Sequence, residues 1–524
     1  MAAAAAQQAT MSAATVPVGY GRRTFQRLEH WFDRPLGADL NPLRHLGSLG
    51  FLFFWLIAAS GIYLYAVLDT SATGAYPSID QLSREQWYLG GVLRSLHRYA
   101  CDGFILVMVA HLLREWLFGR YGGFRRYSWL TGVPLLPFVF ACAIGGFWLN
   151  WDALGQFSAQ ATAEWLDGLP VFASPLTRNF LSAATVGDRL FSLFVFIHLG
   201  LPLLLLFALW FHIQRISLAE VFPPRALAWG TVATLLVLSL LKPVLSHAPA
   251  DLALAPTQLA LDWIVLFVHP LMYLTSAGFV WGLVAALLLL LTLLPWLSRQ
   301  ARAPVAVVSP DDCNGCRRCL ADCPYAAITM APHPLRHQAG REIAVVDADL
   351  CAACGICVGS CPSSTPFRSI AELTTGIDLP QSPISELRRQ LHSGLAALQT
   401  PHKLVVFGCD HGADVQALRA PDVLVFSMVC TGVLPPSFVE YALRDGATGV
   451  LVTGCRAGSC EFRLGQLWTS ERLQGLREPH LRASVPRQCI ATSWADRGEE
   501  VLLAQALDTL RQLPTRPDEP APKR

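Results

Sequence analysis

Six long apolar stretches constrain the fold of residues 46–297 more than any other feature of this 524-residue chain. A helix needs about 20 apolar residues to span a bilayer, and each stretch is close to that length. The stretches are 47–68, 91–113, 131–150, 190–212, 227–246 and 272–297. Lipid offers no hydrogen bonds to the backbone, so such segments fold as helices. Residues 30–297 are therefore expected to form an all-α membrane domain with six transmembrane helices.

Basic residues alternate along the connections, and this pattern predicts the orientation. Arginines precede the first stretch and occupy the second and fourth connections, whereas the other connections are mainly acidic. Because basic residues concentrate on the cytoplasmic side, both termini are expected in the cytoplasm. The Ala-rich start lacks the regions of a signal peptide, and residues 1–29 are expected to be a flexible tail.

A duplicated cysteine run, C-x2-C-x2-C-x3-C-P, follows the membrane domain. Three closely spaced thiolates of each run can hold one 4Fe–4S cluster, while the fourth cysteine ligates the other cluster. The expected ligands are Cys313, Cys316, Cys319 and Cys361 for cluster one, and Cys351, Cys354, Cys357 and Cys323 for cluster two. Structural zinc also uses C-x2-C pairs, but zinc explains neither the third cysteine nor the duplication. The spacing resembles that of bacterial two-cluster ferredoxins, which implies an α+β module over residues 305–370.

Four histidines lie inside the second and fourth apolar stretches. His97 and His111 are 14 residues apart, and so are His198 and His212. Fourteen residues bring a helix back to within about 40° of the same face, about 21 Å farther along. Antiparallel pairing sets His97 opposite His198 and His111 opposite His212. This predicts two bis-histidine haem b sites at two membrane depths, whereas a single histidine would more often be a packed polar residue.

Glycines and arginines support the haem interpretation. Two glycine pairs repeat the 14-residue spacing, namely Gly47 with Gly61 and Gly132 with Gly146. Missing side chains let a flat macrocycle approach the backbone, although helix-packing glycines give the same pattern. Arg94 and Arg114 lie three residues from His97 and His111 and can reach haem propionates. Their alternative role is to anchor the helix at the membrane interface.

Residues 30–297 resemble the cytochrome b of the quinol-oxidising bc and related complexes. The resemblance rests on these histidines, glycines and arginines, on His198-x3-Pro202 and on Trp148–Gln156. It implies quinone as a substrate and a homodimer formed through this domain. Position 193, where the family has an arginine near the fourth-helix histidine, is Leu193, and the family's last helices are absent.

An acidic residue stands at the position of the family's outer quinol site. Leu261-Asp262-Trp263 occupies the place where the family commonly has Pro-Glu-Trp-Tyr. The resemblance implies that Asp262 transfers the quinone proton, and the alternative is an interfacial anchor. His269 is either a second proton carrier or a structural residue.

The C-terminal region is expected to be an α/β domain with a parallel sheet. Apolar runs at Lys403–Gly408, Val423–Met428 and Gly449–Thr453 alternate with helical stretches at 436–445 and 496–512. Four cysteines follow the strands: Cys409, Cys430, Cys455 and Cys460. Sites gather at this edge of α/β sheets, so the four thiols are expected to hold one 2Fe–2S cluster. Zinc and scattered buried thiols are the alternatives.

Residues 402–513 resemble the delta subunit of methyl-viologen-reducing hydrogenase. The matching pieces are Cys430-Thr431-Gly432 and Gly454-Cys455…Gly458-Ser459-Cys460. This family connects a hydrogenase to a heterodisulfide reductase through a 2Fe–2S cluster. It usually has a second cysteine three residues after the first, where this chain has Gly412. Cys489, Cys101 and Cys142 remain and are expected to be packing residues.

The expected domain order follows from these assignments. The predicted segments are a tail (1–29), the cytochrome b-like membrane domain (30–297), a linker (298–304), the ferredoxin-like module (305–370), a helical connector (371–401), the hydrogenase delta-like domain (402–513) and a second tail (514–524).

Together the parts predict a membrane-bound electron-transfer subunit of a multi-subunit quinone oxidoreductase in the bacterial inner membrane. Electrons would pass between a cytoplasmic flavoprotein, of the NAD(P)H- or heterodisulfide-reductase type, and the quinone pool. No G-x-G-x-x-G follows a strand, so the flavin or nicotinamide site is expected on the partner. A net charge of +2 does not favour nucleic acid as a partner. The alternatives are an anchor that connects a hydrogenase to quinone, and a redox sensor or assembly anchor without turnover.

Overall fold

The structure is a computed structural model that describes residues 16–171, 175–176, 181, 185–214, 216, 218–254, 258–297, 304–367 and 373–514. The first 15 residues of the expected N-terminal tail, residues 298–303 of the linker and residues 515–524 of the C-terminal tail lie outside this range. The chain divides into two compact units. The N-terminal unit comprises residues 1–214 and 219–300, and the C-terminal unit comprises residues 215–218 and 301–524.

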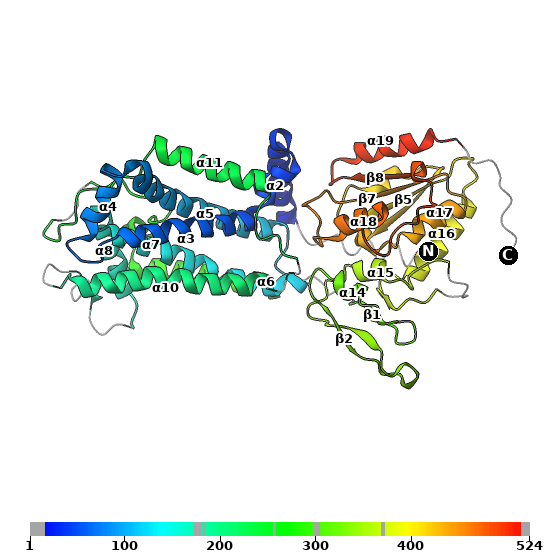
Figure 1. Ribbon diagram of the computed structural model, residues 1–524, viewed down its shortest axis with the longest axis horizontal. Coiled ribbons are helices and arrows are strands. Elements are labelled where there is room, and N and C mark those ends of the chain that lie inside the picture. The colour runs from blue at the N-terminus through cyan, green and yellow to red at the C-terminus, as the bar shows by residue number, and fades with distance from the viewer. Residues whose placement is uncertain are drawn as a thin grey trace. The chain divides into compact units, whose positions relative to one another are not determined.

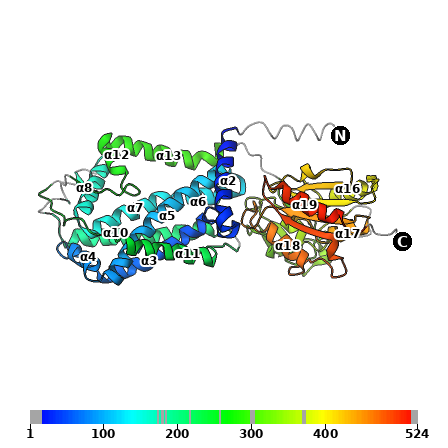
Figure 2. The same cartoon turned by 90° about the horizontal axis from the view of Figure 1, so that it is seen from above.

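In its described part, the N-terminal unit is built from helices. They are α2 (Val16–Leu36), α3 (Leu46–Val67), α4 (Ala75–Arg84), α5 (Val92–Leu117), α6 (Arg126–Gly132), α7 (Leu135–Asn150), α8 (Ala153–Asp167), α10 (Asp188–Ile213), α11 (Arg225–Leu241), α12 (Val268–Leu274) and α13 (Ala277–Leu297). Figures 1 and 2 show α3, α5, α7 and α10 running side by side. The predicted all-α architecture of this region is confirmed.

Among the described residues, four helical segments are long and apolar enough to cross a membrane. These segments are Leu46–Val67, Gly123–Asn150, Asp188–Ile213 and Ala277–Leu297. The other two expected spans are also helical but are not among these segments. Helix α5 has 26 residues but includes charged side chains. Helix α11 is apolar but has 17 residues, or roughly 26 Å of helix against a hydrocarbon core of about 30 Å.

Helix α2 includes all of the described part of the expected flexible tail. Residues 16–29 are helical rather than irregular, so the tail prediction requires this correction. The helix is held by tertiary contacts that its own polar sequence does not reveal. Asn41 Nδ2 donates to the Glu29 carbonyl at 2.8 Å, and the Phe25 ring meets the edge of Phe118 with centroids 6.1 Å apart.

The ferredoxin-like module consists of two pairs of short strands and two short helices. Strand β1 (Val307–Val308) pairs antiparallel with β4 (Ile377–Asp378), and β2 (Ile328–Pro332) pairs antiparallel with β3 (Glu342–Val346). Helices α14 (Arg318–Ala321) and α15 (Ile356–Ser360) each carry the third cysteine of one run. The duplication of the sequence is therefore also a duplication of local structure.

A parallel sheet forms the C-terminal domain, as predicted, and it has four strands. The strand order is β6 (Val423–Met428), β5 (Leu404–Cys409), β7 (Gly449–Gly454) and β8 (Ile490–Trp494). The helices of this region are α16 (Ile384–Ala397), α17 (Ser437–Arg444), α18 (Gly465–Gln474) and α19 (Glu500–Arg511). Strands β5 and β7 are buried along their whole length, which explains their continuous apolar runs. Strand β8 and helix α18 were not among the predicted elements.

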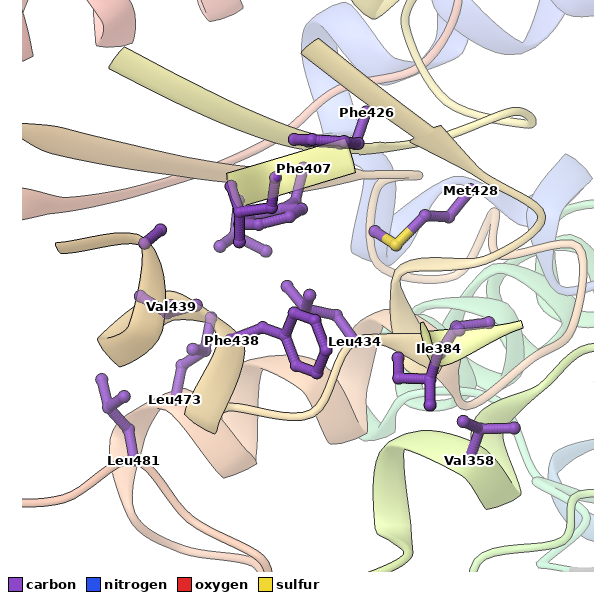
Figure 3. Packing of buried hydrophobic residues seen from close by; sticks show 14 of the residues in the cluster. Val358, Ile384, Phe407, Phe426, Met428, Leu434, Phe438, Val439, Leu473 and Leu481 are labelled. Atoms are coloured by element: carbon purple, nitrogen blue, oxygen red, sulfur yellow. The ribbon is translucent and has the colours of Figure 1, made fainter. Parts of the chain in front are cut away.

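The two modules of the C-terminal unit share one hydrophobic core. Val358 of α15 and Ile384 of α16 belong to the same buried cluster as Phe407 of β5 and Phe438 of α17. Figure 3 shows these side chains converging between the sheet and the helices. Since burial of apolar surface is the main stabilising term in folding, the modules are expected to fold as one body.

Candidate metal centres

Helices α5 and α10 bring His97 and His198 next to each other. Their ring centroids are 6.4 Å apart with an angle of 67° between the planes. A metal ion binds an imidazole nitrogen at about 2 Å, so two imidazoles on opposite sides of one ion have ring centres roughly 6 Å apart. The spacing therefore fits one metal ion between the two rings. His111 and His212 come from the same two helices and lie within electrostatic reach of each other.

Hydrogen bonds to Nδ1 orient three of the four imidazoles. His97 Nδ1 lies 3.0 Å from the Ile57 carbonyl oxygen, and His198 Nδ1 lies 3.0 Å from the Cys142 carbonyl oxygen. His212 Nδ1 lies 3.3 Å from Thr131 Oγ1. A carbonyl partner implies that Nδ1 carries the proton, which leaves the Nε2 lone pair for a metal.

Each of the four predicted glycines lies directly beside one of the four histidines. A Cβ atom would stand 3.0 Å from Cε1 of the nearest imidazole at Gly61, Gly132 and Gly146, and 3.5 Å at Gly47. The imidazoles are, in the same order, His97, His212, His198 and His111. At Gly61, Gly132 and Gly146 a larger residue would therefore push on a ring that the haem interpretation requires to be fixed, whereas at Gly47 a Cβ atom would make ordinary van der Waals contact.

Hydroxyl groups next to two of these glycines were missed by the sequence reasoning. Ser60 Oγ lies 3.1 Å from His97 Nδ1, and Ser60 precedes Gly61. Thr131, which contacts His212, precedes Gly132 in the same way. The sequence signal for Ser60 and Thr131 is a serine or threonine directly before one of the glycines that lie at the same membrane depth as a histidine.

Both predicted propionate arginines are buried and held by polar partners. Arg94 Nη1 donates to Ser83 Oγ at 2.8 Å, and its Nη2 donates to Ser246 Oγ at 2.9 Å. Arg114 Nε donates to Glu29 Oε1 at 2.8 Å. The hydrogen-bond partners of Arg94 are neutral, and the carboxylates that interact with its charge, Asp152 and Asp80, do so without a direct ion pair. The charge of Arg114 is already balanced by Glu29.

Asp262 is engaged by an arginine and by a turn. Its Oδ1 accepts hydrogen bonds from the Ile264 and Val265 N–H groups, each at 2.8 Å, and its Oδ2 pairs with Arg98. These contacts fit an anchoring role for the carboxylate. His269 is buried, and its Nε2 lies 2.9 Å from Thr162 Oγ1.

The cysteines of the duplicated run gather in two groups, each drawn from both runs. Cys313, Cys316, Cys319 and Cys361 line one pocket, and Cys323, Cys351, Cys354 and Cys357 line another. These are the two sets that the sequence assigned to clusters one and two. Burial raises the pKa of the Cys319 and Cys354 thiols to about 12, so binding of a metal cluster would release their protons.

Left-handed residues recur at equivalent positions of the two runs. Gly315 (φ 69°) and Arg317 (φ 62°) in the first run correspond to Ala353 (φ 52°) and Gly355 (φ 73°) in the second. Alternating right- and left-handed residues turn successive N–H groups toward one concavity, which favours an anionic ligand. A cluster held by four thiolates is such a ligand. The left-handed Arg317 and Ala353 could not have been recognised from residue type.

The four C-terminal cysteines meet at one edge of the parallel sheet. Cys409 Sγ lies 3.9 Å from Cys455 Sγ, and Cys430 and Cys460 complete the group through further thiol contacts. Hydrogen bonds from the Cys430 and Cys455 thiols hold the pKa of the Cys409 thiol well below its ordinary value. Four converging thiols fit a small iron–sulfur cluster. Within the part of the chain that the structure describes, no three Cys, His, Asp or Glu side chains match the geometry of a single-ion site.

Gly412 occupies a position without room for a fifth cysteine. A Cβ atom there would lie 2.9 Å from the Gly454 carbonyl carbon and 3.1 Å from the Cys455 nitrogen. The ends of β7 and β8 would have to move apart to accept any side chain. The close backbone therefore explains why this position holds glycine rather than the cysteine of the family pattern.

Three family models match the chain in successive segments. Residues 32–219 match cytochrome b/b6/petB, residues 312–365 match the 4Fe-4S dicluster domain, and residues 407–513 match the delta subunit of methyl-viologen-reducing hydrogenase. Among solved structures, a chain titled "Hyperthermophilic respiratory Complex III" is similar at 20% identity and a TM-score of 0.40, over 48% of this chain and 75% of that chain. The three predicted resemblances are confirmed, and they indicate a membrane protein with haem-type and iron–sulfur regions that serve electron transfer.

Proposed function

We propose that this chain is the membrane subunit of a quinone oxidoreductase and passes electrons between a cytoplasmic flavoprotein and the quinone pool. The observation that carries the proposal is the pairing of His97 with His198 at a spacing that fits one metal ion. The two cysteine pockets and the C-terminal thiol group support further carriers in the same chain.

The chain's residues would hold five redox groups. Four histidines would bind two b haems, eight cysteines two 4Fe–4S clusters, and Cys409, Cys430, Cys455 and Cys460 one 2Fe–2S cluster. When bound, each group accepts and donates one electron at a time. The Nδ1 hydrogen bonds of His97 and His198 and the left-handed residues of the cysteine loops support ligands that are held in place before a group binds.

The quinone end of the path is proposed to include Asp262. Reduction of a quinone consumes protons and oxidation of a quinol releases them, so a carboxyl group near the quinone would pass protons in either direction. Asp262, which pairs with Arg98, is the proposed group. The partner at the other end must convert a two-electron donor into single electrons, because each proposed carrier takes one. A flavoprotein has this chemistry.

Spectroscopy of the purified native complex tests the proposal. We expect b-type haem absorbance, EPR signals of three iron–sulfur clusters on reduction, and reoxidation of the haems when a quinone analogue is added. Absence of b-type absorbance would refute the haem assignment. Haems that stay reduced after addition of the quinone analogue would refute the quinone link.

The match to a hydrogenase delta subunit favours a second candidate function, in which the chain connects a hydrogenase to quinone. Elemental analysis of the same complex separates the two. Flavin without nickel supports the flavoprotein partner, whereas nickel at one atom per chain supports the hydrogenase.

Substitution of Cys455 tests the C-terminal cluster. We expect Cys455→Ala to remove only the 2Fe–2S signal, because Cys455 Sγ contacts Cys409 in the C-terminal thiol group. Cys489→Ala is the matched control, since Cys489 lies outside that group. EPR of the reduced proteins measures the result, and an unchanged spectrum in Cys455→Ala would contradict the assignment.

A further inference from the structure

The site of cluster two abuts the C-terminal thiol group. Ile356, between Cys354 and Cys357, is fully buried and faces two glycines of the C-terminal domain. A Cβ atom on Gly432 would lie 2.6 Å from Ile356 Cγ1, and one on Gly465 would lie 3.6 Å from Ile356 Cδ1. A Cβ on Gly465 would also lie 2.3 Å from Cys430 Sγ. One isoleucine side chain therefore separates the two sets of thiols.

Arg472 of α18 contacts residues next to both the cluster two cysteines and the C-terminal thiol group. Its side chain is fully buried, and its guanidinium pairs with Asp322, the residue before Cys323. The other arm of the guanidinium donates to the Gly432 carbonyl, two residues after Cys430, at 3.2 Å. A single side chain thus bonds next to a ligand of each proposed cluster.

The charged groups around Arg472 are paired with one another. Asp322 also accepts a hydrogen bond from Arg477 Nη1 at 2.8 Å, and Arg477 pairs in addition with Glu471, so two carboxylates face two guanidinium groups. Arg472 Nε is buried without a hydrogen-bond partner among the described residues. Burying a charge is costly unless its surroundings use it, and thiolate-bound clusters on both sides are anionic.

We propose that Arg472 positions cluster two against the C-terminal 2Fe–2S cluster and stabilises the reduced state of both. The inference rests on the proposed function and adds the order of carriers within it. With both clusters bound, one electron would pass from the reduced 2Fe–2S cluster held by the C-terminal thiols to the oxidised cluster two, with no bond made or broken. Cluster one is then the next carrier rather than the first. A fixed positive charge favours the more negative reduced state and so raises the reduction potential.

EPR-monitored redox titration of the full chain with Arg472→Met tests the proposal. Methionine keeps much of the volume and removes the charge. We expect lower midpoint potentials for cluster two and the 2Fe–2S cluster, an unchanged potential for cluster one, and weaker magnetic coupling between the first two. Unchanged potentials would overturn the proposal, and so would an equal shift of all three clusters.

Two further variants separate positioning from general stability. Arg472→Lys keeps the charge but cannot bond Asp322 and the Gly432 carbonyl at once, so we expect near-normal potentials with weakened coupling. Arg477→Met is the matched control, because Arg477 shares Asp322 but pairs also with Glu471. It should leave the 2Fe–2S potential and the coupling intact. If Arg472→Met does not assemble, normal coupling in Arg472→Lys overturns the proposal.

The failure of the inference and that of the proposed function give different spectra. A wild-type chain without a 2Fe–2S signal would contradict the proposed function itself. Coupling that is present in the wild type and persists in Arg472→Met contradicts only the role of Arg472.

Discussion

At the scale of single residues, the proposed haem sites depend on glycines, whose lack of a Cβ atom makes room for the imidazoles. Gly61, Gly132 and Gly146 each leave room for an imidazole whose Cε1 would stand 3.0 Å from an added Cβ. Contacts this short force the neighbour to move. A histidine that ligates a metal on its far side has little freedom to do so.

Gly61→Ala is therefore expected to weaken the haem site of His97 and His198. The added methyl group displaces the His97 ring and strains its Nδ1 hydrogen bond to Ile57. We expect loss of part of the b-type absorbance, measured per chain in reduced-minus-oxidised spectra, while the site of His111 and His212 is retained. Gly200→Ala is the control, because a Cβ there meets nothing within 4 Å. Equal spectra for both variants would contradict the steric argument.

At the scale of secondary-structure elements, the two cysteine loops exchange their fourth ligands. Cys361 follows α15, yet it lines the pocket of Cys313, Cys316 and Cys319. Cys323 follows α14 and lines the pocket of the second run. The proposed ligand sets thus tie together segments almost 40 residues apart in the sequence.

The exchange predicts which cluster each substitution removes. Cys361→Ala is expected to have the same EPR phenotype as Cys313→Ala, namely loss of cluster one, although Cys361 belongs to the second run. Cys351→Ala should instead remove cluster two. The exchange would be wrong if Cys361→Ala and Cys351→Ala gave the same spectrum.

The elements that sequence could predict are those with a local signal. Helix geometry gives the 14-residue histidine spacing a meaning, and ligand chemistry does the same for the cysteine runs. The candidate ligands could therefore be identified from the sequence. Strand β8 mixes polar with apolar residues, and α18 is largely polar, so neither shows the periodicity of a buried element. Arg472 could not be found because its partners, Asp322 and Gly432, are 150 and 40 residues away.

At the scale of the whole molecule, the distribution of basic residues sets the expected topology. The arginines before the first membrane helix and in the second and fourth connections predict that the C-terminal unit faces the cytoplasm. Right-side-out spheroplasts test this orientation. We expect external protease to leave the C-terminal unit intact, and to degrade it once the membrane is made permeable. Degradation in intact spheroplasts would reverse the topology.

The shared core of the C-terminal unit has a consequence for how fast charge can move through it. Val358 packs with Phe407 and Phe438 in one buried cluster. The ferredoxin-like module is therefore packed against the C-terminal domain and does not move independently on a flexible linker. Separating the modules would expose that core to water, at a cost set by the apolar area uncovered. Electron transfer between the proposed clusters of the two modules would therefore be limited by tunnelling and driving force rather than by a diffusional search, and we expect its rate to be insensitive to solvent viscosity.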